Sequence, residues 1–296
     1  TLTIIRSVCD SFHLPMRTLT ILTLTACAAL AQPAWENPVK KLLKEGKPVI
    51  GATITVASAE VAAQAAGMGF DFLWIEMEHS PITLETARNM ILATRGLKAL
   101  PFIRVPVNEL WMAKRALDAG AIGVVFPFTS TPELAKQAVA GMKYPPAGRR
   151  GSGPALATFR GPAPECYADC MDKNGLVIVI IEEVGAVDKI EEIAATPGID
   201  VLFIGANDLS YSLGLRGNQD HPKHREAMAK IIAAARKNGL PVGRPVANAS
   251  QIQEGIKQGF TFFQGPSDMV LMRTGAESLL KPFGKWAADG KDRPTY

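Results

Sequence analysis

The sequence has few cysteines and no cluster of basic residues. Two of its four cysteines, Cys9 and Cys27, precede Gln32. Cys166 and Cys170 have no second Cys/His pair at metal-ligand spacing nearby, which argues against a zinc site. We expect two small buried residues or one disulfide there. A net charge of +4 without a Lys/Arg run gives no indication of a nucleic-acid partner.

The apolar stretch near the amino terminus is too short to span a bilayer, so no membrane span is expected. It does fit a secretory leader, which predicts residues 1–31 as an upstream segment and signal peptide, and residues 32–296 as one exported, periplasmic domain. Two alternatives stay open, namely a lipoprotein processed at Cys27 and a cytoplasmic protein with a disordered leader. The leader pattern comprises a basic Met16-Arg17, an apolar Leu19–Leu30 and the cleavage pattern Ala29-Leu30-Ala31.

No G-x-G-x-x-G motif follows the first apolar run, which argues against an open, dinucleotide-binding sheet. Short apolar runs instead alternate with longer amphipathic ones from about Lys47 onward. Eight such units in about 250 residues predict an α/β fold, a single (β/α)8 TIM barrel. The expected strands are 49–56, 70–76, 100–105, 122–128, 176–181, 201–204, 240–246 and 260–264. The expected helices include 82–95, 109–119, 132–142, 186–195, 225–238 and 249–258.

Polar residues stand where four of the predicted strands end. His79, Arg104, Glu182 and Asp208 follow the second, third, fifth and sixth strands. Each alone has a structural interpretation, because a strand-end carboxylate is often a helix cap and a lone histidine is often a loop residue. A barrel brings all strand ends to one mouth, however, and burying these groups together is costly unless they pair or hold a metal.

These four strand-end residues predict enolate chemistry with a divalent metal and without an organic cofactor. Two carboxylates, with other positions left to water and substrate, suit Mg²⁺ or Mn²⁺. Such a metal would bind the carboxylate and keto oxygen of a 2-oxo acid and act as a Lewis acid. Arg104 would stabilise the developing enolate oxygen, and His79 has the ordinary pKa that suits proton transfer near neutrality.

Several segments resemble the HpcH/HpaI family of class II pyruvate aldolases, over about Asn37 to Pro282. The resemblance implies a barrel of the phosphoenolpyruvate/pyruvate-binding type and a divalent metal (Mg²⁺, Mn²⁺ or Co²⁺). It also implies small-molecule substrates (a 2-oxo acid and an aldehyde) and a homo-oligomer, a hexamer with exchanged C-terminal helices. The segments are Glu78-His79-Ser80-Pro81, Arg104, Lys143–Gly151 and Phe203–Ser210.

The resemblance also implies roles for individual residues. His79 would accept the proton, Arg104 would stabilise the transition state, and Asp118 would raise the basicity of the histidine. Glu76 would belong to the same catalytic set, at a position where the family commonly has Asp. The metal ligands would be Glu182 and Asp208. The segment expected to contact the carboxylate of pyruvate comprises Gly205, Ala206, Asn207 and Asp208.

Two features leave alternatives open. Ile180 stands where relatives hold a substrate-contacting Gln, so substrate preference or activity itself is expected to differ. The loop 149–153 is expected near the mouth, where its arginines would contact an acidic substrate, or else is simply solvated. Three rival functions remain open. They are an acyl-CoA lyase of the citrate lyase β or malyl-CoA type, which shares the barrel and metal site, an exported solute-binding protein, which the leader suggests, and a barrel that only binds 2-oxo acids because of Ile180.

Overall fold

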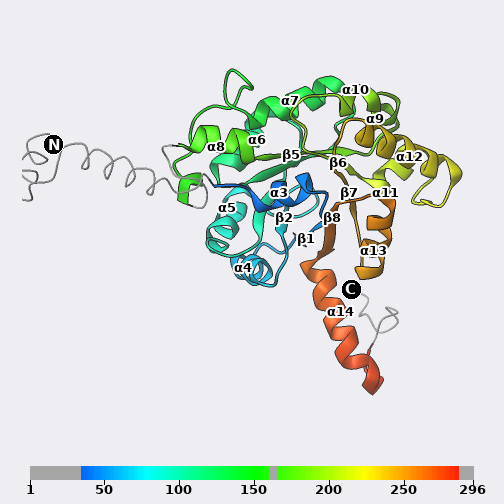
Figure 1. Cartoon of the computed structure of the whole chain (residues 1–296). Coiled ribbons are helices and arrows are strands. Elements are labelled where there is room, and N and C mark those ends of the chain that lie inside the picture. Colours follow the sequence, from blue (N-terminus) through cyan, green and yellow to red (C-terminus); the bar gives the residue numbers. More distant parts are fainter. Residues whose placement is uncertain (1–34, 160–165, 287–296) are drawn as a thin grey trace, which may run out of the picture. The chain divides into compact units, whose positions relative to one another are not determined.

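The computed structural model describes residues 35–159 and 166–286. Eight parallel strands close into a barrel in which each strand pairs with the next and β8 pairs with β1. Helices surround this barrel (Figure 1), so the predicted (β/α)8 fold is confirmed. The predicted signal peptide lies outside the described residues. The strands are β1 (Val49–Ile54), β2 (Phe72–Glu76), β3 (Leu100–Arg104), β4 (Gly123–Phe126), β5 (Leu176–Ile181), β6 (Val201–Ile204), β7 (Val242–Pro245) and β8 (Phe262–Ser267).

Helices follow every strand, and none in the described part of the chain is long and apolar enough to cross a membrane. The helices that precede β5 are α3 (Pro38–Lys44), α4 (Ala59–Gly67), α5 (Leu84–Ala93), α6 (Leu110–Asp118), α7 (Pro132–Met142), the 3-10 turn η1 (Ala157–Phe159) and α8 (Tyr167–Asn174). Those that follow β5 are α9 (Val184–Asp188), α10 (Ile190–Ala194), α11 (Ala206–Ser212), α12 (Pro222–Lys237), α13 (Ala249–Gln258), α14 (Asp268–Leu280) and the 3-10 turn η3 (Lys281–Phe283).

The helices begin where the sequence supplies capping side chains. Thr83 accepts a hydrogen bond from the backbone N–H of Thr86 at the start of α5. Thr131 does the same for α7, where Pro132 occupies the first helical position. These hydroxyls satisfy backbone donors that have no partner within the helix. The helix boundaries are therefore set locally by the turn chemistry between the apolar runs.

Aromatic side chains fill the barrel interior. The Phe72 ring stacks on Phe102 and Phe262, with centroid separations of 5.0 and 4.5 Å. Gly51 makes room for this stack, because a Cβ atom at this position would lie 2.2 Å from the Phe72 ring. Gly123 does the same for Phe102, at 2.8 Å. The inward-facing positions thus form a packed core below the mouth, where the fold usually binds its ligands.

The direction of the chain separates two ends of the barrel. The strands all run the same way, so their carboxyl ends form one mouth, while the helices run back and end near the start of the next strand. Residues at helix C-termini therefore lie at the amino-terminal end of the barrel.

Of the two cysteines in the described residues, Cys166 is exposed and Cys170 is buried, and they form no disulfide.

Candidate active site

Glu76, the last residue of β2, organises one side of the mouth. Its buried carboxylate accepts hydrogen bonds from the backbone N–H groups of Glu78 and His79, at 2.7 and 3.0 Å. It also accepts from Trp74 Nε1 at 3.0 Å and from Arg104 Nη1 at 3.3 Å. Four donors on one carboxylate hold the side chain in place. Glu76 therefore positions the His79 loop and the arginine together.

Arg104 ends β3 and faces this cluster. Its Nη1 pairs with Glu76, its Nη2 pairs with Glu78, and Nη2 lies 3.4 Å from His79 Nε2. The His79 side chain is 63% exposed, whereas the Arg104 and Glu78 side chains are about 10% exposed. Burial raises the pKa of the Glu78 carboxyl, against the lowering effect of Arg104. A buried arginine thus stands beside a solvent-accessible histidine, as proton transfer next to a stabilised anion requires.

Glu182 follows β5 and is buried on the opposite side of the cavity, at 2% exposure. Burial, joined by repulsion from Glu78 and Asp208, raises the pKa of its carboxyl from 4.5 to about 7. The backbone N–H of Phe128 opposes this by donating to Glu182 Oε1 at 2.6 Å. Phe128 has a positive φ of 49°, a conformation that side chains rarely adopt and that costs on the order of 1–3 kcal/mol. The strained backbone lies at the buried carboxylate.

The segment Gly205–Asp208 joins β6 to α11 and borders the same cavity. The first backbone N–H groups of a helix have no intrahelical partners. In α11 no side chain caps them either. His224 Nε2 lies 2.8 Å from the Ala206 carbonyl, and the Ser210 hydroxyl donates to the Asn207 carbonyl at 2.6 Å. These contacts fix the turn so that its N–H groups can receive a carboxylate.

The strand ends enclose a cavity of about 120 Å³. The structure therefore brings together the predicted metal ligands, the arginine and the predicted substrate-binding segment. It also adds a glutamine from β8 that the sequence interpretation did not assign. The lining residues are Arg104, Ile180, Glu182, Phe203, Gly205, Ala206, Asn207, Asp208, Pro245 and Gln264.

The same cavity has room and oxygen donors for a divalent metal. Gly205 leaves the space beside Glu182 open, because a Cβ at position 205 would lie 2.7 Å from Glu182 Oε2. Asp208 provides a second carboxylate on the cavity wall. Within the described ranges, no group of three or more His, Cys, Asp and Glu residues could hold a metal ion. The donor set fits a hard cation with two protein ligands, completed by water and substrate oxygens.

Asp118 does not line this cavity in its own chain. It is the last residue of α6, at the amino-terminal end of the barrel, and lies 3.2 Å from Arg150 Nη2. The Arg150 guanidinium lies between the rings of Tyr144 and Tyr167, at 4.7 and 5.3 Å from their centroids. Burial raises the pKa of the Asp118 carboxyl, with Arg150 opposing it. Within one chain Asp118 therefore does not contact His79, whose basicity the family resemblance implies that it raises.

The loop 149–153 likewise departs from its expected place. The chain enters it from the end of α7, and the Arg150 N–H donates to the Lys143 carbonyl at 2.9 Å. The loop thus lies at the end of the barrel opposite to the mouth of the same chain. The expectation that it contacts substrate is wrong for a single chain, because helix direction rather than glycine content decides where the loop lies.

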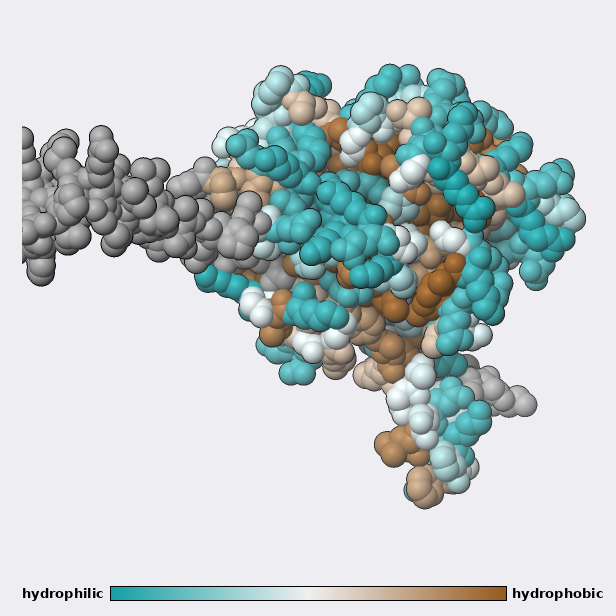
Figure 2. Space-filling model, viewed as in Figure 1, coloured by the Kyte–Doolittle hydropathy of each residue, from teal (hydrophilic) through white to brown (hydrophobic). Residues whose placement is uncertain are grey.

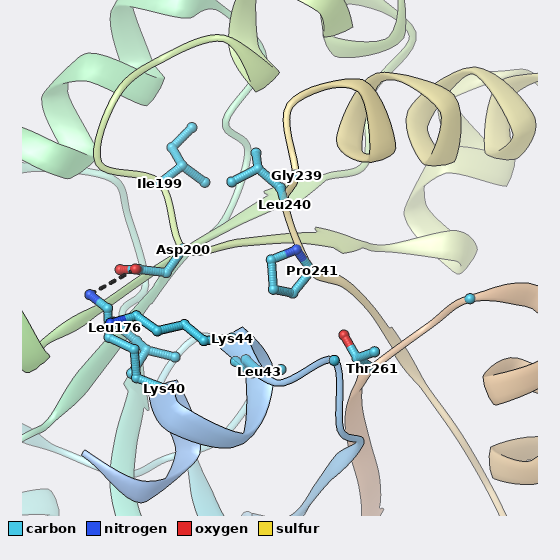
Figure 3. Close-up of a pocket in the computed structure, with 12 residues that line it drawn as sticks. Lys40, Leu43, Lys44, Leu176, Ile199, Asp200, Gly239, Leu240, Pro241 and Thr261 are labelled. Carbon is cyan, nitrogen blue, oxygen red and sulfur yellow. Dashed lines mark ion pairs between the residues drawn. The ribbon is translucent and has the colours of Figure 1, made fainter. Parts of the chain in front are cut away.

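A larger cavity, of about 540 Å³, lies between α3 and the starts of several strands. Figure 3 shows Lys40 and Asp200 pairing across its edge, with 2.8 Å between Lys40 Nζ and Asp200 Oδ1. Leu176, Ile199 and Leu240 supply an apolar wall. The cavity lies at the amino-terminal end of the barrel, and of its two lysines Lys40 is paired with Asp200. Chemistry in this fold gathers at the other end, so we assign the site to the smaller cavity.

Three features of the site were not predicted from the sequence. Glu78 belongs to a motif that was noticed, but its pairing with Arg104 depends on the approach of β2 and β3. The hydrogen bond from the Phe128 N–H to Glu182 depends on a positive φ that a phenylalanine in the sequence does not predict. The position of Gln264 could have been recognised, because a polar residue at the end of the eighth apolar run is expected at the barrel mouth. Only the closed barrel shows that this strand end meets the others.

The fold and the mouth together define a barrel enzyme with an acid–base and anion-stabilising site. Residues 51–274 match the HpcH/HpaI aldolase/citrate lyase family model. The chain belongs to this family, and it is an aldolase, a carbon–carbon lyase.

Two similar proteins are a 5-keto-4-deoxy-D-glucarate aldolase of Klebsiella pneumoniae and a hydroxypyruvate/pyruvate aldolase of Paraburkholderia phytofirmans. Over 251 residues this chain is 35% and 34% identical to them, covering 84% and 83% of itself and 97% and 96% of theirs. A solved family structure from Burkholderia cenocepacia has a TM-score of 0.77 at 32% identity, covering 84% of this chain and 99% of that one. A citrate lyase from Burkholderia xenovorans, at 16% identity and a TM-score of 0.56, shares the fold alone.

Proposed function

We propose that this aldolase cleaves and forms 4-hydroxy-2-oxo acids, with pyruvate and an aldehyde as the partners. The observation that carries the proposal is the single mouth that combines Arg104, His79 and the buried Glu182 beside an open glycine. Relatives with 33–35% identity are named as aldolases of keto-deoxy sugar acids and of pyruvate. These names support a 2-oxo acid substrate for this chain.

In cleavage, His79 accepts the proton from the C4 hydroxyl as the C3–C4 bond breaks and the aldehyde leaves. Arg104 donates to the enolate oxygen that gains negative charge, while Glu76 and Glu78 keep its guanidinium in place. The N–H groups of the first turn of α11 bind the substrate carboxylate. We propose that Glu182 and Asp208 hold a divalent cation, Mg²⁺, Mn²⁺ or Co²⁺, which supplies Lewis-acid polarisation of the keto group when bound.

The test is pyruvate release from a panel of 4-hydroxy-2-oxo acids, before and after chelation with EDTA. We expect activity to vanish with EDTA and to return with Mn²⁺, Co²⁺ or Mg²⁺. Glu182→Gln and Asp208→Asn should each lower turnover by at least about 100-fold. Glu183→Gln is the matched control, because Glu183 contacts Ser130 instead of the cavity.

Three results would point elsewhere. Full activity after exhaustive chelation would overturn the metal proposal, and borohydride trapping with pyruvate would then identify a Schiff-base lysine. Cleavage of a 3-hydroxyacyl-CoA with release of acetyl-CoA would favour the acyl-CoA lyase. Tight binding of 2-oxo acids without turnover on any substrate of the panel would favour an exported binding protein.

We propose further that the enzyme is a homo-oligomer, a hexamer with exchanged α14 helices. The 13 residues of α14 include no buried side chain. Figure 2 shows apolar side chains on the surface of α14, at the foot of the view. Burial against a second copy would remove them from water and also stabilise a helix that is short for an isolated one. The exposed apolar residues of α14 are Met269, Val270, Leu271, Met272 and Leu279, and Phe283 follows in η3.

The location is proposed to be the periplasm, on the strength of the leader pattern in residues 1–31. Among the described residues, the contacts of the site all come from positions after Glu36, and we expect that removal of residues 1–31 leaves an active enzyme. Expression of the full chain in a Gram-negative host should yield periplasmic protein that begins at Gln32, as read by mass spectrometry. A lipid on Cys27 would indicate lipoprotein processing, and unprocessed cytoplasmic protein would contradict export.

A further inference from the structure

Gln264 points into the barrel mouth from β8. Side chains alternate along a strand, and the Phe262 ring lies inside the barrel against Phe72. Phe263 faces outward, because its ring would lie 2.7 Å from a Cβ at Gly255 on α13. Gln264 therefore faces inward again, one layer nearer to the mouth than the aromatic stack. Its backbone is fixed there by pairing with Pro245 of β7 and Gly51 of β1.

The amide of Gln264 has no protein partner. The side chain is half-buried, and none of the described residues makes a hydrogen bond to it. Its nearest neighbours in the paired strands, Gly51 and Pro245, have no polar side chain. A glutamine amide carries two N–H donors and a carbonyl acceptor, and such groups usually find partners when they are withdrawn from water. The amide is thus available to a ligand.

Gln264 also lies on the boundary between two cavities. It borders the cavity of about 120 Å³ that contains Arg104 and Glu182. It borders a second cavity of about 480 Å³ as well, formed at the carboxyl ends of β7, β8 and β1. Ala206 and Pro245 are the other residues that line both. The second cavity adds the polar residues Thr53, Gln219, Arg244, Gln251 and Ser267.

On the basis of the proposed function, we propose that Gln264 binds the C4 oxygen of the substrate and that the second cavity holds the aldehyde portion. The pyruvate portion occupies the small cavity beside Arg104 and Glu182, so the C3–C4 bond lies where the two cavities meet. The amide N–H donates to the C4 hydroxyl before cleavage and to the aldehyde oxygen afterwards. The polar lining of the second cavity suits a hydroxylated aldehyde.

The test compares two reactions of one variant, Gln264→Leu, which keeps the size of the side chain and removes the donors. Exchange of the pyruvate methyl protons in D₂O, followed by NMR, requires only the pyruvate portion of the site. Cleavage of 4-hydroxy-2-oxo acids requires the C4 oxygen as well. With Mn²⁺ present, we expect exchange to stay within about 3-fold of wild type and kcat/KM for cleavage to fall about 10- to 100-fold.

Gln64→Leu is the matched control, since Gln64 is exposed on α4, and it should leave both reactions unchanged. Normal cleavage by Gln264→Leu overturns the assignment, and so does an equal loss in both reactions, which places the residue on the pyruvate portion or on the fold. Absence of exchange in the wild type with Mg²⁺, Mn²⁺ and Co²⁺ overturns the proposed function itself, and this is read from the wild type alone.

Discussion

Arg104 is the residue whose geometry is most specific in the site. Its two terminal nitrogens pair with different carboxylates, those of Glu76 and Glu78, and the planar guanidinium holds both at once. A lysine would keep the charge but lose this fork. We expect Arg104→Lys to lower turnover by at least about 100-fold while the fold is retained. Pyruvate release and thermal melting measure the two effects.

The matched control for this change is Arg115→Lys, because Arg115 lies on the exposed face of α6, over the ring of Trp111. It should leave turnover unchanged. Near-normal turnover in Arg104→Lys would mean that position 104 provides only a positive charge that attracts the substrate, without directed hydrogen bonds.

Glu182 makes the stability of the metal-free protein depend on pH. Its pKa is raised in the folded state to about 7, from an ordinary value of 4.5. Between these pH values the folded state binds more protons than the unfolded chain, so the free energy of unfolding falls as pH rises through this window. Glu182→Gln removes this effect. At pH 8 it should raise the melting temperature of the EDTA-treated protein by on the order of 5 °C.

At pH 4.5 the two melting temperatures should approach each other, because wild-type Glu182 is then protonated. The control Glu183→Gln should show no comparable gain at pH 8. A gain of equal size at both pH values would show that Glu182→Gln acts through packing, and a loss at pH 8 would show that the charged carboxylate is stabilised in the fold.

At the scale of elements, α14 is the helix that the barrel does not cover. A 13-residue helix is marginal by itself, and each large apolar side chain gains about 1.5–3 kcal/mol when fully buried. If α14 packs on another copy, the double change Met272→Glu and Leu279→Glu should dissociate the oligomer. Size-exclusion chromatography with light scattering should then give a mass at most about half that of the wild type.

Gln253→Glu on the exposed face of α13 is the control for added negative charge, and its mass should equal that of the wild type. An unchanged mass in the α14 variant would show that this helix does not carry the interface. A monomeric wild type would contradict the hexamer altogether.

At the scale of the whole molecule, if Asp118 raises the basicity of His79 as the family resemblance implies, the two residues must come from different chains of an oligomer. Asp118 lies at the amino-terminal end of its own barrel, and His79 lies at the mouth. His79→Ala and Asp118→Asn should each be inactive alone. Co-expressed with different tags, they should recover about one quarter of wild-type activity in the mixed oligomer, because a complete site takes His79 from one kind of chain and Asp118 from the other.

Two differently tagged copies of Asp118→Asn form the control and should recover nothing. Full activity of Asp118→Asn alone would leave Asp118 with only its structural contact to Arg150. Inactive single variants without recovery in the mixed oligomer would contradict a site shared between chains.

Much of the fold was accessible from local patterns alone. The eight strands and the helices α5, α6, α7, α12 and α13 were predicted within a few residues, because alternating strand and helix periodicity depends on near neighbours in the chain. The predicted helix 186–195 is divided into α9 and α10, and α4 and α8 were not predicted. The capping residues Thr83 and Thr131 act within a few residues of their own position. For the same reason, Glu76, Arg104, Glu182 and Asp208 were placed at strand ends and hence at one mouth.

By itself, then, the sequence determined the barrel and the residue types at its mouth, because parallel strands bring their ends to one face whatever lies between them. Only the tertiary structure decided which of these groups meet. The Arg104–Glu78 pair, the Phe128 N–H on Glu182 and the inward amide of Gln264 depend on how strands far apart in the sequence pack side by side. The direction of α6 likewise decided that Asp118 contacts Arg150, which no local pattern of residues encodes.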